Sequence, residues 1–149
     1  MLASGGDSVT PHLFLKSSDN NKEQTYNYND NKTSINIDID SLHIVNESMW
    51  RVIYDNNVGT ASHIKKIEGI EFAGKTGTAQ VYNLDKGKTG AKSLQDHALF
   101  ISFAPFESPE IIVSVIIDNG GSGSGVAAPI ARDIINFYFK NSKTKLSKK

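Results

Sequence analysis

A short run of residues combines a lysine, two threonines and small neighbours in a pattern that suits an anionic ligand. Residues 72–80 are predicted to form a strand, on which Thr76 and Thr78 place two hydroxyls on one face because side chains alternate along a strand. Lys75 adds a positive charge, and Gly77 lets a ligand approach the backbone closely. A cation, two hydroxyls and bare N–H groups on one sheet edge suit a carboxylate beside a developing oxyanion.

This run needs a sheet to hold it, and the sequence predicts three strands, at residues 70–82, 97–106 and 110–118. The connection between the second and third strands is short enough for an antiparallel hairpin. Both of these strands are apolar on both faces, which indicates that elements of the fold cover the sheet on both sides.

Two main helices are expected. The first is predicted from Asp40, with Asp40 or Ser41 as the N-cap. It carries one apolar stripe at helical spacing, made of Leu42, Val45, Met49, Val52 and Ile53. A second helix is predicted at 126–139, with Pro129 in its first turn, where a proline is tolerated.

The remaining segments are predicted to be less regular. Residues 1–4 are expected to end a helix that Gly5 and Gly6 close, and 9–15 to form a short edge strand or an extended segment. Residues 16–36 are rich in polar side chains and predict an exposed loop, and 140–149 predict a frayed basic tail.

Composition excludes several classes of function. The chain has 149 residues, enough for one domain, and its formal net charge is zero, so nothing favours nucleic acid as a partner. There is no cysteine, and the histidines lack metal-ligand spacing, so neither a thiol nor a metal centre is expected. The longest apolar run, 111–117, is far too short to span a bilayer, so no membrane segment is expected in this chain.

Four blocks in the same order resemble the C-terminal part of the transpeptidase domain of class B penicillin-binding proteins, especially the elongation type called penicillin-binding protein 2. The blocks are residues 3–13, 58–61, 72–80 and 96–139. Within the third block, Lys75-Thr76-Gly77 resembles the Lys-Thr-Gly signature of serine enzymes that recognise penicillin.

The resemblance implies a partial α+β fold. The family domain has a five-stranded antiparallel sheet, and two of its strands and its helical half lie upstream of the segment that this chain resembles. We therefore expect three antiparallel strands plus two main helices, with 1–149 as a C-terminal fragment of one transpeptidase domain. One sheet edge and one helix face would then lack a partner.

The resemblance also implies an activity for the parent protein, a peptidoglycan D,D-transpeptidase at the periplasmic face of the bacterial inner membrane. In such enzymes a serine attacks the D-Ala-D-Ala stem peptide, forms an acyl-enzyme and passes the acyl group to an amine; β-lactams mimic the stem. Lys75 would orient that serine and hold the substrate's charge, and Thr76 and Thr78 would bind its carboxylate. The N–H of Thr78 would form half of the oxyanion hole. No cofactor is implied.

The family's serine nucleophile is not expected in this chain. The Ser-x-x-Lys pattern occurs at 62–65 and 142–145, but neither serine opens an apolar helix, where the lysine would lie one turn on as the base. The chain alone is therefore predicted to be inactive. A non-catalytic module that binds stem peptides or a partner protein is the main alternative.

Other literal motif matches compete with this interpretation. Residues 69–76 satisfy the phosphate-loop pattern of nucleotide hydrolases, which requires a helix from Thr76, whereas the residues that follow are strand formers. A second Lys-Thr-Gly at 88–90 and a Ser-Asp-Asn at 18–20 lie in polar segments and are interpreted as chance. Asp96 and His97 are a possible charge-relay fragment, although a strand cap is favoured.

Overall fold

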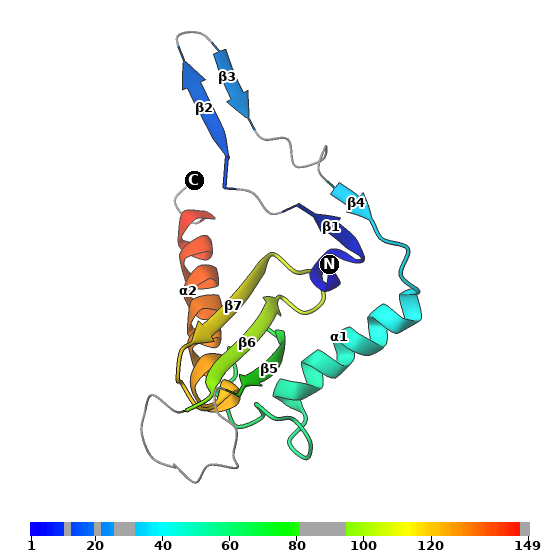
Figure 1. Ribbon diagram of the computed structural model, residues 1–149, viewed down its shortest axis with the longest axis vertical. Coiled ribbons are helices and arrows are strands. Elements are labelled where there is room, and N and C mark those ends of the chain that lie inside the picture. Colours follow the sequence, from blue (N-terminus) through cyan, green and yellow to red (C-terminus); the bar gives the residue numbers. More distant parts are fainter. Residues whose placement is uncertain (11–12, 20–21, 26–31, 81–94, 147–149) are drawn as a thin grey trace. The chain divides into compact units, whose positions relative to one another are not determined.

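The structure is a computed structural model that describes residues 1–10, 13–19, 22–25, 32–80 and 95–146 (Figure 1). The chain divides into two compact units, Met1–Ile44 and Val45–Lys149. The assignment of 1–149 to one domain stays a prediction.

The first unit consists of short elements. A 3₁₀ helix, η1 Leu2–Ser4, is followed by Gly5 as its C-cap. The φ of Gly5 is 65°, in the left-handed region, and this confirms that a glycine closes a helix there. Two strand pairs follow, both antiparallel. Their bounds are β1 Asp7–Val9 with β4 Lys32–Ser34, and β2 Lys16–Asp19 with β3 Lys22–Thr25.

These strands correct two expectations. The early strand begins at Asp7 rather than at residue 9 and ends at Val9, and 13–15 are not in a strand. The polar segment 16–36 is more regular than a loop because it contains three of the four short strands. The described side chains in this segment are nevertheless exposed, as its polarity predicts.

Helix α1, Ile39–Tyr54, begins one residue before the predicted start, and its cap is a different residue. The Asp38 carboxylate accepts hydrogen bonds from the Ser41 N–H, at 2.9 Å, and from the Ser41 hydroxyl, at 2.8 Å. These two bonds lower the pKa of Asp38. Asp40 or Ser41 as N-cap is therefore wrong, because the cap must reach an N–H three residues on and Asp38 does so.

The second unit is built on a three-stranded antiparallel sheet with the order β5-β6-β7. Its strands are β5 Ala73–Ala79, β6 His97–Ala104 and β7 Ile111–Ile117. In register, Thr76 lies opposite Phe100, which lies opposite Val115. This confirms three antiparallel strands, each shorter than its predicted range.

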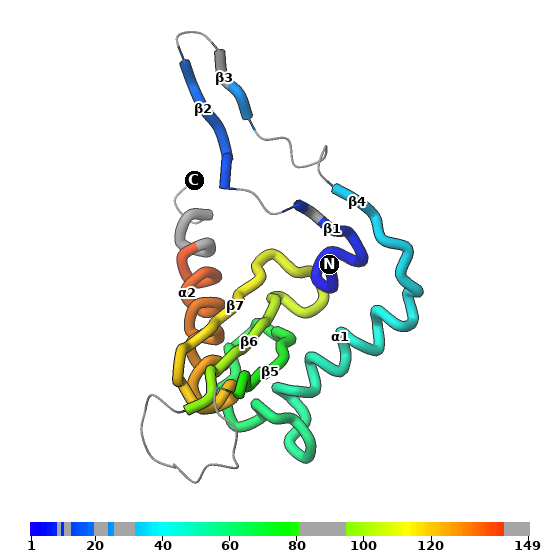
Figure 2. Tube along the Cα trace, in the orientation of Figure 1, coloured from blue at the N-terminus to red at the C-terminus, as the bar shows by residue number. Residues whose placement is uncertain are grey.

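One face of this sheet carries the core. Phe100, Val113 and Val115 lie on that face and are almost fully buried. Figure 2 shows the chain leaving β7 and returning along the sheet as a helix, whose buried residues join the same cluster. The members contributed from outside the strands are Ile53, Ala61, Ile64, Ile67, Phe72, Ala127, Ala128, Ala131, Ile135 and Phe139.

The opposite face is covered at one end only. There Phe103 and its strand partner Ala73 are buried, and the Phe103 ring stacks on that of Phe106, whose centre lies 6.3 Å from the centre of the Trp50 ring on α1. Ile101, Ile112 and Ile116 point to that face and are 48%, 57% and 64% exposed. The expectation that both faces are covered therefore holds for the core face and, on the opposite face, only around Phe103. At Ile101, Ile112 and Ile116 the apolar pattern continues, but the described residues supply no second layer there.

The returning helix differs from its prediction at both ends. A π-helical turn, η5 Gly123–Ala127, precedes α2, Ala128–Leu146, and Pro129 lies in the first turn of α2 as expected. The helix continues through 140–146, so a frayed tail from residue 140 is wrong as far as Leu146. Residues 147–149 lie outside the described part of the chain.

Phe100 and Ile101 are neighbours on β6 that point to opposite faces, and this allows a matched test of the core. Phe100→Ala should cost about 3–5 kcal/mol of unfolding free energy, because it opens a cavity in the core. Ile101→Ala should cost about 1 kcal/mol or less, because its side chain is half exposed. Urea unfolding followed by circular dichroism measures both. Equal losses would contradict the assignment of the two faces.

Candidate functional site

The predicted anion-binding run lies on β5 with the alternation that the sequence indicates. Thr76 and Thr78 point to the face that carries the core, and Lys75 points to the opposite face. Lys75 and Thr78 are exposed, and Thr76 and Gly77 are half-buried. Within the described residues β5 is an edge strand, so alternate N–H and C=O groups on its outer side have no strand partner.

The ammonium group of Lys75 lies at this outer edge. Its Nζ donates a hydrogen bond to the carbonyl oxygen of Thr76, at 2.7 Å. An exposed cation held on a backbone carbonyl loses little when it turns toward an anion, because a charge-assisted bond replaces a neutral one. Lys75 is therefore placed to bind a negatively charged group beside Thr76.

The structure adds one residue that the sequence did not identify as part of the site. The Thr60 hydroxyl oxygen lies 3.0 Å from the Thr76 hydroxyl oxygen, within hydrogen-bond distance, and either can donate. Thr60 lies in the block 58–61, one of the four blocks that resemble penicillin-binding proteins, and the sequence assigned it no role. No periodicity or motif links Thr60 to Thr76, so sequence reasoning had no signal for this contact.

A tight turn after α1 puts Thr60 in this place. The Gly59 N–H donates to the Asp55 carbonyl at 2.8 Å, and the Ala61 N–H donates to the Val52 carbonyl at 2.9 Å. A Cβ on Gly59 would lie 2.5 Å from the carbonyl oxygens of Arg51 and Asp55, so only glycine fits. The turn is therefore fixed against the last turns of α1, with Thr60 between its two anchors.

Lys66 strengthens the same turn. Its Nζ donates to the carbonyls of Ile53 and Ser62, and it lies 5.1 Å from the centre of the Tyr54 ring. Burial lowers the pKa of Lys66 and raises the pKa of Tyr54. Both carbonyls face the cation, and Ile53 lies in the last turn of α1, where a positive charge is favourable. Lys66 therefore supports the turn rather than the ligand edge.

The structure tests some of the other motif matches, and the rest lie outside the described residues. The phosphate-loop interpretation of 69–76 is wrong because Ala73–Ala79 is a strand and no helix begins at Thr76. Ser62 lies in a turn and does not open a helix, as expected. Residue 20 and the second Lys-Thr-Gly at 88–90 lie outside the described residues. So do the side chains of 142–145, although their backbone is helical.

Asp96 and His97 hold a turn. The carbonyl of Asp96 accepts the N–H of Gly121 at 2.8 Å, and Nδ1 of His97 accepts the N–H of Asn119 at 3.0 Å. These bonds join the start of β6 to the segment that follows β7. The strand-cap interpretation is the one that fits these contacts.

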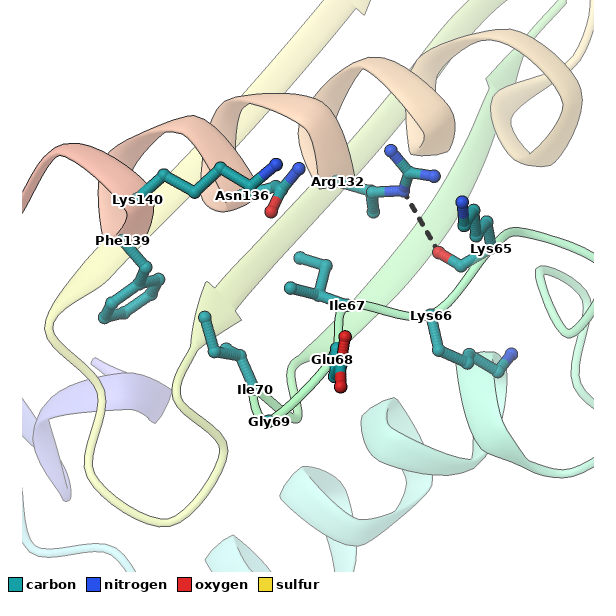
Figure 3. Close-up of a pocket in the computed structure, with 10 residues that line it drawn as sticks. All are labelled: Lys65, Lys66, Ile67, Glu68, Gly69, Ile70, Arg132, Asn136, Phe139 and Lys140. Carbon is teal, nitrogen blue, oxygen red and sulfur yellow. Dashed lines mark hydrogen bonds between the residues drawn. The ribbon is translucent and has the colours of Figure 1, made fainter. Parts of the chain in front are cut away.

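A cavity of about 570 Å³ lies elsewhere, between residues 65–70 and α2 (Figure 3). Ile67, Ile70 and Phe139 form its apolar part, and no residue of β5 lines it. Arg132 at its rim is already bonded, through Nε to the Lys65 carbonyl at 3.0 Å. The cavity is therefore separate from the threonine and lysine edge, and that edge remains the candidate site.

Comparisons with known proteins support the resemblance. A sequence profile described as penicillin binding protein transpeptidase domain matches residues 1–136. The peptidoglycan D,D-transpeptidase MrdA of Haemophilus influenzae is 37% identical over 105 residues, which cover 67% of this chain and 16% of that protein. The chain thus spans about a sixth of the length of this relative.

Solved structures share the fold. The crystal structure of Pseudomonas aeruginosa PBP2 in complex with WCK 5153 matches with a TM-score of 0.70 and 33% identity, over 92% of this chain and 28% of that one. Penicillin-binding protein A from M. tuberculosis, as an imipenem acyl-enzyme complex, matches with a TM-score of 0.60 and 26% identity, over 90% of this chain and 27% of that one.

The contact between Thr60 and Thr76 can be tested on the chain itself. Thr60→Val removes the hydroxyl at nearly constant shape, so the Thr76 side chain should lose its restraint. The cost in unfolding free energy should be below about 1 kcal/mol, because the pair is exposed. NMR couplings that report the Thr76 χ1 rotamer measure the effect, with Thr60→Ser as the control. The same Thr76 rotamer population in both variants would count against the contact.

Proposed function

Because the chain belongs to the penicillin-binding protein transpeptidase family, we propose that it supplies the substrate-binding edge of a peptidoglycan D,D-transpeptidase. The observation that carries the proposal is the placement of Lys75, Thr76, Gly77 and Thr78 on the edge strand β5. An edge strand leaves backbone N–H groups open to a ligand, and these residues add the charge and hydroxyls that a carboxylate requires.

Each residue has a distinct proposed role. Lys75 holds the negative charge of the substrate and orients the nucleophilic serine. Thr76 and Thr78 donate their hydroxyl hydrogens to the terminal carboxylate of a D-Ala-D-Ala stem or to the carboxylate of a β-lactam. The N–H of Thr78 donates to the oxyanion that forms when the serine attacks the carbonyl. Gly77 keeps the approach to the backbone clear.

The reaction requires groups beyond this edge. The serine attacks the carbonyl carbon of the penultimate D-Ala, the terminal D-Ala leaves as an amine, and an acyl-enzyme forms. A second amine then attacks the ester and releases the serine, which completes the cross-link. We assign the serine and its lysine base to polypeptide upstream of this segment, which would be the main partner of the chain.

Two relatives support this proposal. The similar Haemophilus protein is named a peptidoglycan D,D-transpeptidase, and the similar mycobacterial protein forms an acyl-enzyme with imipenem. By analogy we place the parent enzyme at the periplasmic face of the inner membrane. Among the described helices, none is long and apolar enough to cross a membrane.

Labelling with a fluorescent penicillin, read by intact mass, tests the proposal. We expect no adduct on this chain alone. In a mixture with the polypeptide encoded immediately upstream, we expect a stable acyl adduct on an upstream serine. An adduct on this chain by itself would overturn the assignment of the nucleophile. No adduct in either sample would leave a non-catalytic module that binds stem peptides or a partner.

Lys75 is the residue whose loss should matter most. In the mixture that accepts label, Lys75→Ala should slow acylation about 100-fold or more, because a preorganised charge at the reacting group is lost. Lys65→Ala is a matched control, since Lys65 is also exposed and lies off β5. Acylation rates from the time course of labelling compare the two variants. A Lys75 variant as fast as the control would remove Lys75 from the site.

A further inference from the structure

The first residue of the π-helical turn, Gly123, is buried against the backbone of the sheet. A Cβ on Gly123 would lie 2.4 Å from the Gly77 carbonyl oxygen, 2.6 Å from the Leu99 carbonyl oxygen and 3.1 Å from the Gly77 nitrogen. Cβ atoms do not approach backbone atoms closer than about 3 Å in real proteins. The helical turn therefore touches β5 at Gly77, in a gap that no side chain can enter.

This contact lies on the face of the sheet where the two threonine hydroxyls are. Ala127, four residues after Gly123, packs in the core with Ala98 and Phe100, and these residues pair with Thr78 and Thr76. On the other face, a Cβ on Gly77 would come within 3.2 Å of the Leu99 Cβ. Gly77 is therefore confined between Leu99 on one side and the helical turn on the other.

The turn that carries Gly123 is itself rigid. The Ser122 hydroxyl accepts the Gly125 N–H at 3.0 Å, and the Ser122 carbonyl accepts the Val126 N–H at 2.9 Å. Just before it, the Gly121 N–H is bonded to the Asp96 carbonyl at the start of β6. Ala128, which follows the turn, is fully buried. The position of Gly123 is thus set by bonds and packing independent of β5.

We propose that Gly123 is a positioning residue that determines how closely the backbone of Gly77 packs against the helical turn. Through Gly77 it also determines the positions of Thr76 and Thr78. This inference rests on the proposed function, in which those residues bind the carboxylate and the oxyanion. A methyl group at Gly123 forces the strand or the turn to move by several tenths of an ångström or more, since both close contacts are with backbone atoms. Misplacement on the order of 1 Å costs a reaction about 100-fold in rate.

The experiment compares Gly123→Ala with Gly125→Ala in the labelled mixture of the chain and its upstream polypeptide. Gly125 lies in the same turn but is exposed, and its Cβ would meet only the Ser122 side chain, at 3.3 Å or more. Gly123→Ala should lower the maximal acylation rate at least about tenfold, and Gly125→Ala should change it less than about twofold. The maximal rate and the apparent penicillin affinity are measured separately, well below the melting temperature.

A second measurement distinguishes positioning from a general loss of structure. In the ¹⁵N spectrum of the chain alone, Gly123→Ala should shift the amides of Gly77 and Thr78 and leave those of β7 unchanged. Shifts spread evenly over the sheet, or none at Gly77, would overturn the inference. This measurement does not depend on acylation.

If the wild-type mixture takes no label, the proposed enzyme function fails, and the amide shifts alone decide whether Gly123 positions Gly77. If the wild type is labelled and both glycine variants react equally fast, the inference fails and the function stands. If Gly123→Ala does not fold, Ser122→Ala replaces it, because removing the cap loosens the turn without a clash. Ser122→Ala should shift the Gly77 amide and slow acylation at least twofold, and equality with Gly125→Ala would overturn the inference.

Discussion

The packing of the Phe100 ring against Gly74 is the interaction on which the position of β5 depends. A Cβ on Gly74 would lie 2.4 Å from Cζ of Phe100, so the ring occupies the space that a side chain on β5 would fill. The ring is 1% exposed and belongs to the cluster that binds α2 to the sheet. The edge strand is thus joined to the core through a glycine one residue before Lys75, and this lets an otherwise polar strand remain attached. The same contact explains why 69–76 matches the phosphate-loop pattern in sequence but not in structure. The glycine at position 74 makes room for the Phe100 ring and not for a phosphate.

Much of the fold could be predicted because local patterns carry it. Three strands and two main helices follow from short apolar runs, helical spacing and Pro129 in a first turn, and all are present. The errors have specific causes. Asp38, Asp40 and Ser41 are all good caps by type, and only geometry selects Asp38. The extension of α2 to Leu146 could not be predicted from an apolar stripe, because residues 140–146 are mostly lysine and other polar residues. Such residues extend a helix readily once the preceding turns supply the nucleus.

The residue types of the candidate site could be identified from the sequence, but the contacts that hold these residues in place could not. Residue types alone indicated that Lys75, Thr76 and Thr78 could bind an anion. The contacts that hold them come from Thr60 and Gly123, which are distant in sequence and belong to no periodic pattern. A glycine in a flexible-looking run such as 120–125 is easily interpreted as a turn. Its role as a close backbone contact emerges only when a Cβ is placed in three dimensions.

The supports of β5 have one property in common, and it bears on how a ligand approaches. The Phe100 ring, the Thr60 hydroxyl and the Gly123 backbone all contact β5 from the core face or its margin. Among the residues that the structure describes, they leave the outer edge of the strand without a strand partner and Lys75 exposed. Preorganised donors are effective only if they keep their positions when charge develops, since reorganisation would cost much of the stabilisation. A strand held at its core face and without a strand partner at its outer edge meets that requirement. In the proposed enzyme the anionic substrate and the serine would approach along this edge, which Lys75 can reach from one face and Thr76 and Thr78 from the other.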